Sequence, residues 1–339
     1  MRRRSKHALL QIVPFAAFQV RQSEPATLRD PVEAAFASAA ISEETAAFNL
    51  RLEENLTGAP TPMDVPIPEM RAARAAGRGI IPLYGPRETS HWAKIEGPGG
   101  PLNLRITDPP GAPRGVYLHV HGGGWTFGSP EQSDEINAWI AEATGALVVS
   151  VKYRLGPENR WPAPLEDCVA AAQWVLAKNI GPVVIGGESA GAHLAASTLL
   201  WLRDNGLLRG VAGAALTYGM YDLTLTPSAA LWAERYLILS SLIIRWFVGN
   251  LMGDQDPAQA SPLCSDLRDL VPAQFVVGTE DPLLDDTLFM AARWQAAQNP
   301  AELRVVPGGI HAFDQFDLAI AREALASRHH FIKSCLEQT

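Results

Sequence analysis

Cysteine is scarce in this sequence: among 339 residues it stands only at Cys168, Cys264 and Cys335. The three are widely spaced, so they form neither the paired clusters of a metal site nor the framework of a disulfide-stapled fold. Disulfides are rare in the cytosol, where thiols stay reduced. The sequence therefore predicts a cytoplasmic protein with free cysteines.

Positive charge is also in short supply. The chain has 28 Lys and Arg against 36 Asp and Glu, which gives a formal net charge of −8. The isoelectric point lies near 5.5. This balance disfavours nucleic acid or an anionic membrane surface as a standing partner. It also provides no long-range attraction for an acidic substrate.

Long uninterrupted apolar runs are absent as well. The most apolar region, 219–262, is broken by Arg235 and Arg245, which argues against stable membrane insertion. The basic residues 1–6 precede an apolar stretch that contains Gln11 and Pro14 and lacks a convincing cleavage site. This pattern favours an N-terminal extension over a secretory signal.

What the sequence does contain is a nucleophile signature. Gly187-Glu188-Ser189-Ala190-Gly191 follows the apolar run 182–186 and precedes the small residues of a helix start. Glycines two residues before and after a serine remove side chains that would collide on a strained strand-to-helix turn. Such a turn lifts the serine hydroxyl out of the sheet, next to free N–H groups of the helix. Packing and phosphate-binding turns can share the pentapeptide, so its meaning depends on a base and an acid elsewhere.

Both partners follow the serine in the chain order expected of this turn. Residues 273–278 read as a strand that ends just before Asp281, and residues 302–306 read as a strand that leads to His311. Open α/β sheets place their chemistry beyond the carboxyl ends of strands. We therefore predict Asp281 as the acid and His311 as the base. A turn or helix-capping role for Asp281 is the alternative, and Asp285 could also serve as that cap.

A glycine loop supplies candidate oxyanion donors. Residues 115–121 alternate like a strand and lead into Gly122-Gly123-Gly124. Consecutive glycines let backbone N–H groups face a cavity without Cβ interference. We assign the N–H groups of Gly123, Gly124 and Ala190 as oxyanion donors. A phosphate cradle is the alternative for the triglycine, but no Lys-Ser/Thr pair follows it.

Two histidines near this loop raise the question of a metal. His119 and His121 would face the same side of a strand, yet no third ligand presents itself nearby. We expect His121 to support the glycine loop and predict neither a metal site nor a cofactor.

At this point the chain resembles the hormone-sensitive-lipase-like bacterial carboxylesterases of the α/β-hydrolase superfamily. The matching motifs span residues 70–315: the glycine loop from His121 to Trp125, segments 153–158 and 161–164, the pentapeptide around Ser189, the stretch 281–285, and His311. Two positions depart from the family pattern, Gly156 for the usual Ala and Glu188 for the more frequent Asp. The second departure is expected to alter hydrogen bonding behind the nucleophile or the pH profile.

The resemblance implies an α/β-hydrolase fold, with a mostly parallel central sheet, helices on both faces and a helical cap. Strand and helix alternation from about residue 91 agrees with such a sheet. We expect residues 1–70 to form an N-terminal helical cap segment, and 71–339 the catalytic domain with a cap insertion at about 219–262. An apolar dimer surface is the rival interpretation of that insertion. The chain is therefore expected as a monomer or homodimer.

The predicted function is a serine carboxylesterase acting on small uncharged esters, with short to medium acyl chains implied by the resemblance. Trp92, Trp125, Trp232 and Phe247 are candidates to line its pocket, although each also fits an ordinary core. Two alternatives remain: an amidase or arylformamidase with the same triad, and a non-catalytic small-molecule receptor. Because serine, acid and histidine are all present, a receptor is the less favoured of the two.

Overall fold

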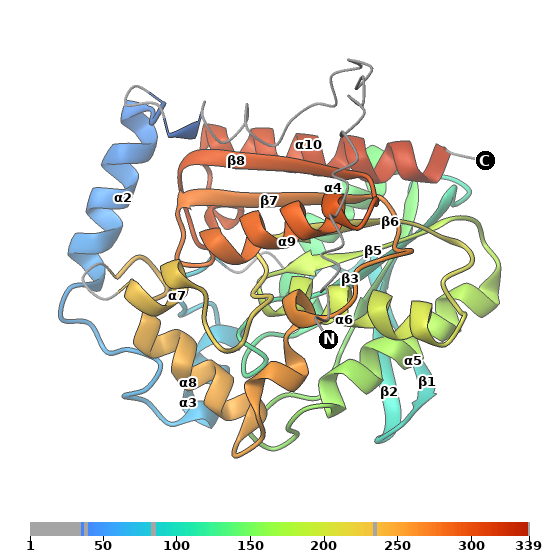
Figure 1. Ribbon diagram of the computed structural model, residues 1–339, viewed down its shortest axis with the longest axis horizontal. Coiled ribbons are helices and arrows are strands. Elements are labelled where there is room, and N and C mark those ends of the chain that lie inside the picture. Colours follow the sequence, from blue (N-terminus) through green and yellow to red (C-terminus); the bar gives the residue numbers. More distant parts are fainter. Residues whose placement is uncertain (1–34, 37–39, 83–85, 233–235, 338–339) are drawn as a thin grey trace, which may run out of the picture.

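One eight-stranded sheet organises the protein in a computed structural model that describes residues 35–36, 40–82, 86–232 and 236–337 (Figure 1). The strand order is β1-β2-β4-β3-β5-β6-β7-β8. β1 and β2 pair antiparallel, as do β2 and β4, and the remaining neighbours are parallel. The strands are β1 Ser90–Gly97, β2 Gly100–Thr107, β3 Gly115–Val120, β4 Ala146–Val151, β5 Val183–Glu188, β6 Val211–Thr217, β7 Ala273–Glu280 and β8 Ala301–Ile310.

The central strands are apolar on both faces, because each face meets a layer of helices. In β3, Val116, Leu118 and Val120 point into one core, whereas Tyr117 points into another. This alternation follows from the two-residue period of a strand. The core of the sheet is therefore buried on both sides, and polar chemistry is confined to the strand ends.

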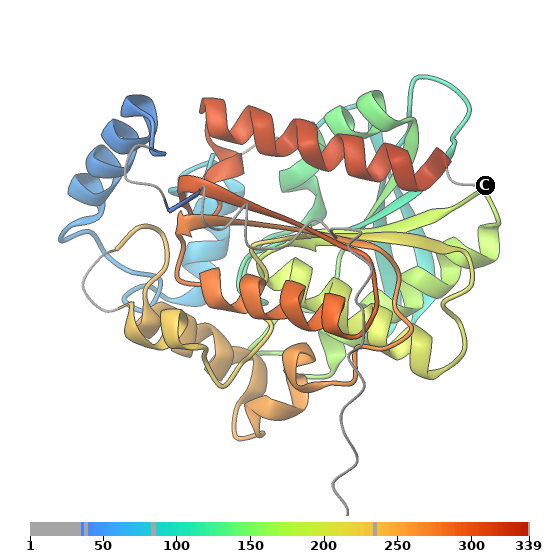
Figure 2. The same cartoon turned by 45° about the horizontal axis from the view of Figure 1, so that its top comes forward.

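Helices cover the two faces of the sheet. The C-terminal helix α10 runs along one face with α4, and α5, α6 and α9 lie on the other, as Figures 1 and 2 show. The bounds are α4 Asp134–Thr144, α5 Ala163–Lys178, α6 Ala190–Asp204, α9 Leu284–Ala296 and α10 Ala319–Glu337. The predicted fold class is thus confirmed. The hairpin of β1 and β2 was not predicted as strands, and it adds the antiparallel edge.

Four further helices gather at one end of the molecule, on the left in Figures 1 and 2. They are α2 Glu43–Leu56, α3 Ile67–Ala75, α7 Pro227–Leu231 and α8 Ser241–Met252. The predicted N-terminal extension and the first part of the cap segment predicted over 1–70 fall on residues 1–34, outside the described residues. In the predicted cap insertion at about 219–262, the apolar stretch after Leu231 was expected to be helical. Instead, Ile238 has a φ of 76°, and Leu237 forms a β-bridge with Leu239. A positive φ is incompatible with a right-handed helix.

No helix within the described part of the chain combines the length and the apolarity needed to cross a bilayer.

Candidate active site

Ser189 stands on a strained turn between β5 and α6. Its φ is 57°, a value that costs energy for a residue with a side chain and persists only where the surroundings enforce it. A Cβ at Gly187 or at Gly191 would lie 2.1 Å or 1.9 Å from the Val120 carbonyl oxygen. The two glycines therefore let the turn pack against the end of β3, as the sequence predicted.

The structure brings Ser189, His311 and Asp281 together from three strand ends. His311 Nε2 lies 2.9 Å from Ser189 Oγ, and His311 Nδ1 lies 2.9 Å from Asp281 Oδ2. Asp281 comes directly after β7 and His311 directly after β8, so the parallel strands deliver both side chains to the edge where β5 ends. This chain of hydrogen bonds has the geometry of a nucleophile, a base and an orienting acid.

Asp281 also plays the turn role considered as its alternative. Its Oδ1 accepts a hydrogen bond from Leu283 N at 2.8 Å, while Oδ2 faces the histidine. Asp285 instead accepts from Ser228 N at 2.8 Å and links α9 to α7. One carboxylate thus orders the loop and orients the imidazole at the same time.

The glycine loop lies against the serine. A Cβ at Gly122 would be 3.5 Å from Ser189 Cβ, and Gly123 and Gly124 have φ values of 118° and 59°. Neither Gly123 N nor Gly124 N donates to a backbone carbonyl within the described residues. Ala190 is the first residue of α6, so its N–H has no partner inside the helix. Three N–H groups are thereby available beside the serine hydroxyl.

His121 holds this loop in place. Its Nδ1 donates to the Gly122 carbonyl at 2.8 Å, and its ring stacks on Tyr153 with centroids 4.3 Å apart. The Tyr153 hydroxyl in turn donates to the His121 carbonyl. Burial lowers the pKa of His121 to about 3, despite the bond to Gly122, so the imidazole is neutral near pH 7.

Glu188 anchors a buried ion network behind the nucleophile. Its Oε2 lies 2.9 Å from His119 Nε2, and its Oε1 accepts from Arg328 Nη1 at 2.5 Å. Burial alone would raise the pKa of Glu188, but the charges and hydrogen bonds of His119 and Arg328 outweigh it and lower the pKa to about 2. Nothing in the sequence pointed to Arg328, which belongs to α10.

His119 and His121 both bind protein groups. Both ring nitrogens of His119 are engaged, one by Glu188 and the other by Ser150 Oγ at 2.7 Å. Across the described residues, no group of three His, Cys, Asp or Glu side chains is placed to hold a metal ion.

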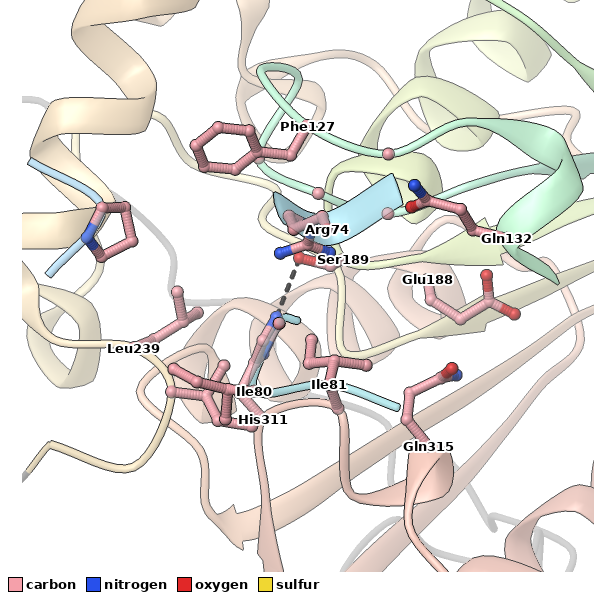
Figure 3. Close-up of a pocket in the computed structure, with 18 of the residues that line it drawn as sticks. Arg74, Ile80, Ile81, Phe127, Gln132, Glu188, Ser189, Leu239, His311 and Gln315 are labelled. Atoms are coloured by element: carbon pink, nitrogen blue, oxygen red, sulfur yellow. Dashed lines mark hydrogen bonds between the residues drawn. The ribbon is translucent and has the colours of Figure 1, made fainter. Parts of the chain in front are cut away.

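A pocket of about 290 Å³ opens over Ser189 and His311 (Figure 3). Of the four aromatic candidates, Phe247 lines it, while Trp92, Trp125 and Trp232 do not. Trp125 is buried and donates from Nε1 to His193 Nδ1 at 3.1 Å, and Trp92 lies on the edge strand β1, 43% exposed. Sequence reasoning missed Arg74, Ile81, Phe127 and Tyr218, which line the pocket.

Of these four residues, Tyr218 could have been predicted from its position in the sequence. It follows β6 directly, at the same sheet edge as the serine, and its ring meets His311 edge-on with centroids 4.9 Å apart. Arg74 could not have been predicted in this way, since it lies before His121, where the first of the quoted motifs begins.

Comparison with known proteins agrees with this geometry. A family model described as the alpha/beta hydrolase fold matches residues 117–315. The acetyl esterase of Salmonella schwarzengrund is 29% identical over 285 residues, covering 80% of this chain and 88% of that protein.

Two solved structures show the same likeness. A hyperthermophilic esterase from the archaeon Pyrobaculum calidifontis superposes with a TM-score of 0.77 at 29% identity, covering 85% of this chain and 97% of that one. EstE5 soaked with p-nitrophenyl butyrate superposes with a TM-score of 0.76 at 25% identity, covering 87% and 99%. The family model matches more than half of this chain, and its relatives in sequence and in structure are esterases. The chain therefore belongs to the α/β-hydrolase fold family and, within it, to the hormone-sensitive-lipase-like carboxylesterases.

Proposed function

We propose that Ser189, His311 and Asp281 are the catalytic triad of this carboxylesterase, with Gly123, Gly124 and Ala190 as oxyanion donors. The observation that carries the proposal is the continuous pair of 2.9 Å contacts from Ser189 Oγ through the His311 ring to Asp281 Oδ2. That contact chain lies beside N–H groups left open by the glycine loop and the start of α6.

The reaction follows from these positions. His311 Nε2 takes the Ser189 proton as Oγ attacks the ester carbonyl, and Asp281 stabilises the imidazolium that forms. The three N–H groups bind the oxyanion, and loss of one such donor typically costs about 3 kcal/mol. Collapse of the intermediate expels the alcohol, which receives the proton from His311. Water then attacks the acyl-serine by the same route and releases the carboxylic acid, without any cofactor.

The residues that line the pocket are evidence for a cap made of two segments. Met70, Ile80 and Ile81 come from the N-terminal segment, and Ile243 and Phe247 come from α8. We propose that the described residues between 35 and 82, together with the described residues between 219 and 262, cover the serine. The N-terminal part of this cap then extends past the expected boundary at residue 70.

The size of the pocket favours small esters. A volume of about 290 Å³ lies at the lower end of small-molecule sites. Relatives named acetyl esterase, and a structural neighbour soaked with p-nitrophenyl butyrate, point to short acyl chains. We propose short to medium acyl esters as the substrates of this chain.

The cysteines bear on the cellular compartment of the protein. All three cysteines are free, and Cys168 and Cys335 are buried. Unpaired thiols support a reducing compartment, and we propose a cytoplasmic enzyme.

The test is hydrolysis of p-nitrophenyl esters from acetate to palmitate by the wild type and by Ser189→Ala. We expect rapid turnover of the short esters and a loss of at least about a thousandfold in kcat for the variant. A matched series of acyl p-nitroanilides and an aryl formamide tests the amidase alternative. A folded wild-type protein that leaves every ester intact, or a variant as active as the wild type, overturns the proposal.

A further inference from the structure

Helix α3 carries two arginines one turn apart, and one of them anchors the helix. Arg71 Nε donates to the Thr126 carbonyl at 2.9 Å, and Arg71 Nη2 donates to the Gly156 carbonyl at 2.7 Å. Its guanidinium also pairs with Glu158 at 2.8 Å. These bonds tie α3 to the segment that follows the glycine loop, so the next turn of the helix is held over the catalytic pocket.

Arg74 occupies that next turn and has no such partners. Its side chain lines the pocket, and Figure 3 shows the guanidinium in the cavity that Ser189 and His311 also line. Among the described residues it forms no ion pair and no side-chain hydrogen bond. The contact it does make is with an aromatic face, because its Cζ lies 5.5 Å from the centre of the Phe127 ring.

This contact places Arg74 beside the oxyanion region. The Phe127 ring packs edge-on against Phe247 with centroids 5.7 Å apart. Phe247 in turn covers Gly124, where a Cβ would lie 2.2 Å from its ring. The cation therefore rests on the aromatic wall next to the loop that is proposed to bind the oxyanion.

No acidic group in the described lining neutralises this cation. Glu188 is the one carboxylate among those residues, and His119 and Arg328 already engage it. The second cation, Arg78, is exposed to solvent. Burial lowers the pKa of Arg74, which means that its charge is held at a cost. An anion in the pocket would remove that cost and would meet a guanidinium fork shaped for a carboxylate.

We infer that Arg74 is a specificity-determining residue that binds a carboxylate of the substrate, so the preferred substrates are small esters whose acyl or alcohol part carries a carboxylate. The inference rests on the proposed esterase function and replaces the sequence-based expectation of an uncharged substrate. With a net charge of −8, the protein does not attract anions from a distance. The recognition is local, and it therefore acts mainly on binding.

The experiment compares matched pairs of esters by proton release at pH 7. Monomethyl glutarate against methyl pentanoate places the carboxylate on the acyl side, and para-acetoxybenzoate against phenyl acetate places it on the alcohol side. For at least one pair, we expect the wild type to favour the carboxylated ester in kcat/KM. In Arg74→Met, the ratio of kcat/KM for the carboxylated ester to kcat/KM for the neutral ester should fall by about ten- to a hundredfold, which is the contribution of a charge-assisted hydrogen bond. In Arg74→Lys, the ratio should lie between those of the wild type and Arg74→Met.

Arg78→Met is the matched control, since it removes a positive charge from the exposed rim of the same pocket. Its ratio should stay within about threefold of the wild type, as expected for a solvent-screened charge. A wild type that prefers the neutral ester in both pairs overturns the inference, and so does an equal fall in both variants.

A binding measurement keeps the inference testable if Arg74→Met does not fold. Free glutarate should compete with phenyl acetate in the wild type, and Arg74→Lys should weaken this competition without abolishing it. Absence of competition in the wild type overturns the inference. Turnover of neutral esters that depends on Ser189 would in that case still stand, so failure of the inference is distinct from failure of the proposed function.

Discussion

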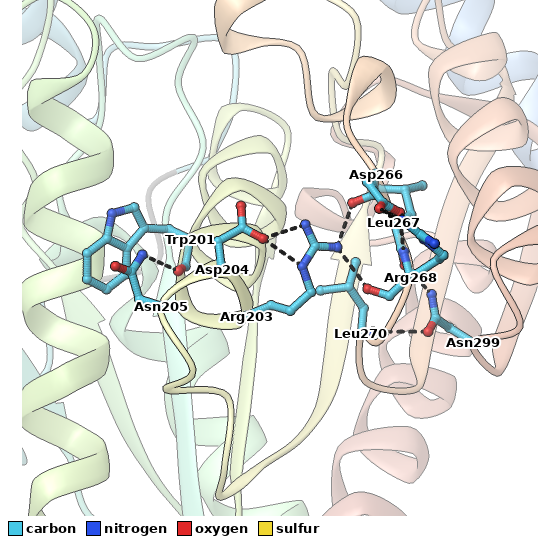
Figure 4. A network of polar contacts seen from close by, with 9 residues as sticks. All are labelled: Trp201, Arg203, Asp204, Asn205, Asp266, Leu267, Arg268, Leu270 and Asn299. Carbon is cyan, nitrogen blue, oxygen red and sulfur yellow. Dashed lines mark hydrogen bonds and ion pairs between the residues drawn. The ribbon is translucent and has the colours of Figure 1, made fainter.

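Two polar networks lie at opposite ends of the parallel strands, and they are built on different principles. The network before β7, shown in Figure 4, is partly exposed: Arg203 donates to the carbonyls of Asp266 and Arg268 at 2.5 Å and 2.8 Å, and the Arg268 side chain is 74% exposed. The network behind Ser189 is dry, since the Arg328 and Asp314 side chains are each 2% exposed.

The two networks also differ in how fully their groups are satisfied. In the network before β7, the buried Asn299 uses both ends of its amide, accepting from Leu270 N and donating to the Leu267 carbonyl. In the buried network, Arg328 Nε and Nη2 find no hydrogen-bond partner among the described residues. The cation beneath the nucleophile is thus held by the charges of Glu188 and Asp314. The catalytic edge therefore depends on buried charge, whereas the opposite edge depends on capped backbone.

The largest effect is expected for Arg328→Met, which disrupts the buried network. It removes the guanidinium that pairs with the buried Glu188 and Asp314, and removal of one partner of a buried pair typically costs about 3 to 5 kcal/mol. We expect a loss of that size in the free energy of unfolding by denaturant, with reduced esterase activity because Glu188 precedes Ser189. The double variant Glu188→Gln with Arg328→Met should recover part of the loss. A single variant within about 1 kcal/mol of the wild type contradicts a charge-dependent edge.

Acid should weaken the catalytic edge through a buried histidine. His193 accepts from Trp125 Nε1 and donates from Nε2 to the Ala260 carbonyl at 2.6 Å, and burial lowers its pKa from 6.5 to about 4. The unfolded chain therefore takes up this proton first. The stability contribution is complete above pH 6.5 and is lost as the pH falls toward 4, with a slope of up to about 1.4 kcal/mol per pH unit.

The measurement is the free energy of unfolding between pH 5 and 6.5 for the wild type and for His193→Gln. Asp286 acts in the opposite direction, because burial raises its pKa to about 7, in spite of the hydrogen bonds that it accepts. The difference between the two proteins isolates the histidine. The free energy of unfolding of the variant should depend less steeply on pH, by up to about 1.4 kcal/mol per pH unit. Identical slopes in the two proteins would show that His193 has the same pKa in the folded and unfolded states.

The smallest effect is expected at the network before β7. Arg203→Ala removes donors to two carbonyls and leaves no charge buried without a partner, since Asp204 is 61% exposed, so it should cost about 1 kcal/mol. The kcat/KM for p-nitrophenyl acetate should stay within about twofold of the wild type, as for most surface changes away from a site. A loss as large as that of Arg328→Met would erase the contrast between the two edges.

Much of the fold and of the candidate site was predictable because its signals are local. The strands before Gly122, Ser189, Asp281 and His311 were all expected, and each is present. Their apolar runs reflect burial on two faces, and their terminal glycines reflect close backbone contacts. The antiparallel hairpin Ser90–Thr107 was not expected, because neither strand has a continuous apolar run: β1 is a mostly exposed edge strand, and β2 contains Asn103, Arg105 and Thr107.

Helix ends and pocket walls were predicted less well. The apolar stretch after Leu231 suggested a helix, but it forms part of the pocket wall through Ile238 and Leu239. Apolar side chains alone do not distinguish a helix from an extended segment that packs on a cavity. Trp125 was a pocket candidate for the same reason, and it is buried against His193 instead.

By itself, the sequence determined the fold class and the order of serine, acid and histidine, because each depends on residues adjacent in the chain. Only the tertiary structure decided what surrounds them. Arg328 meets Glu188 across 140 residues, and Arg74 reaches the pocket from a segment before His121, where the first of the quoted motifs begins. Such contacts depend on which distant elements pack over the strand ends, and a charge has no fixed role until its neighbours and its access to water are set.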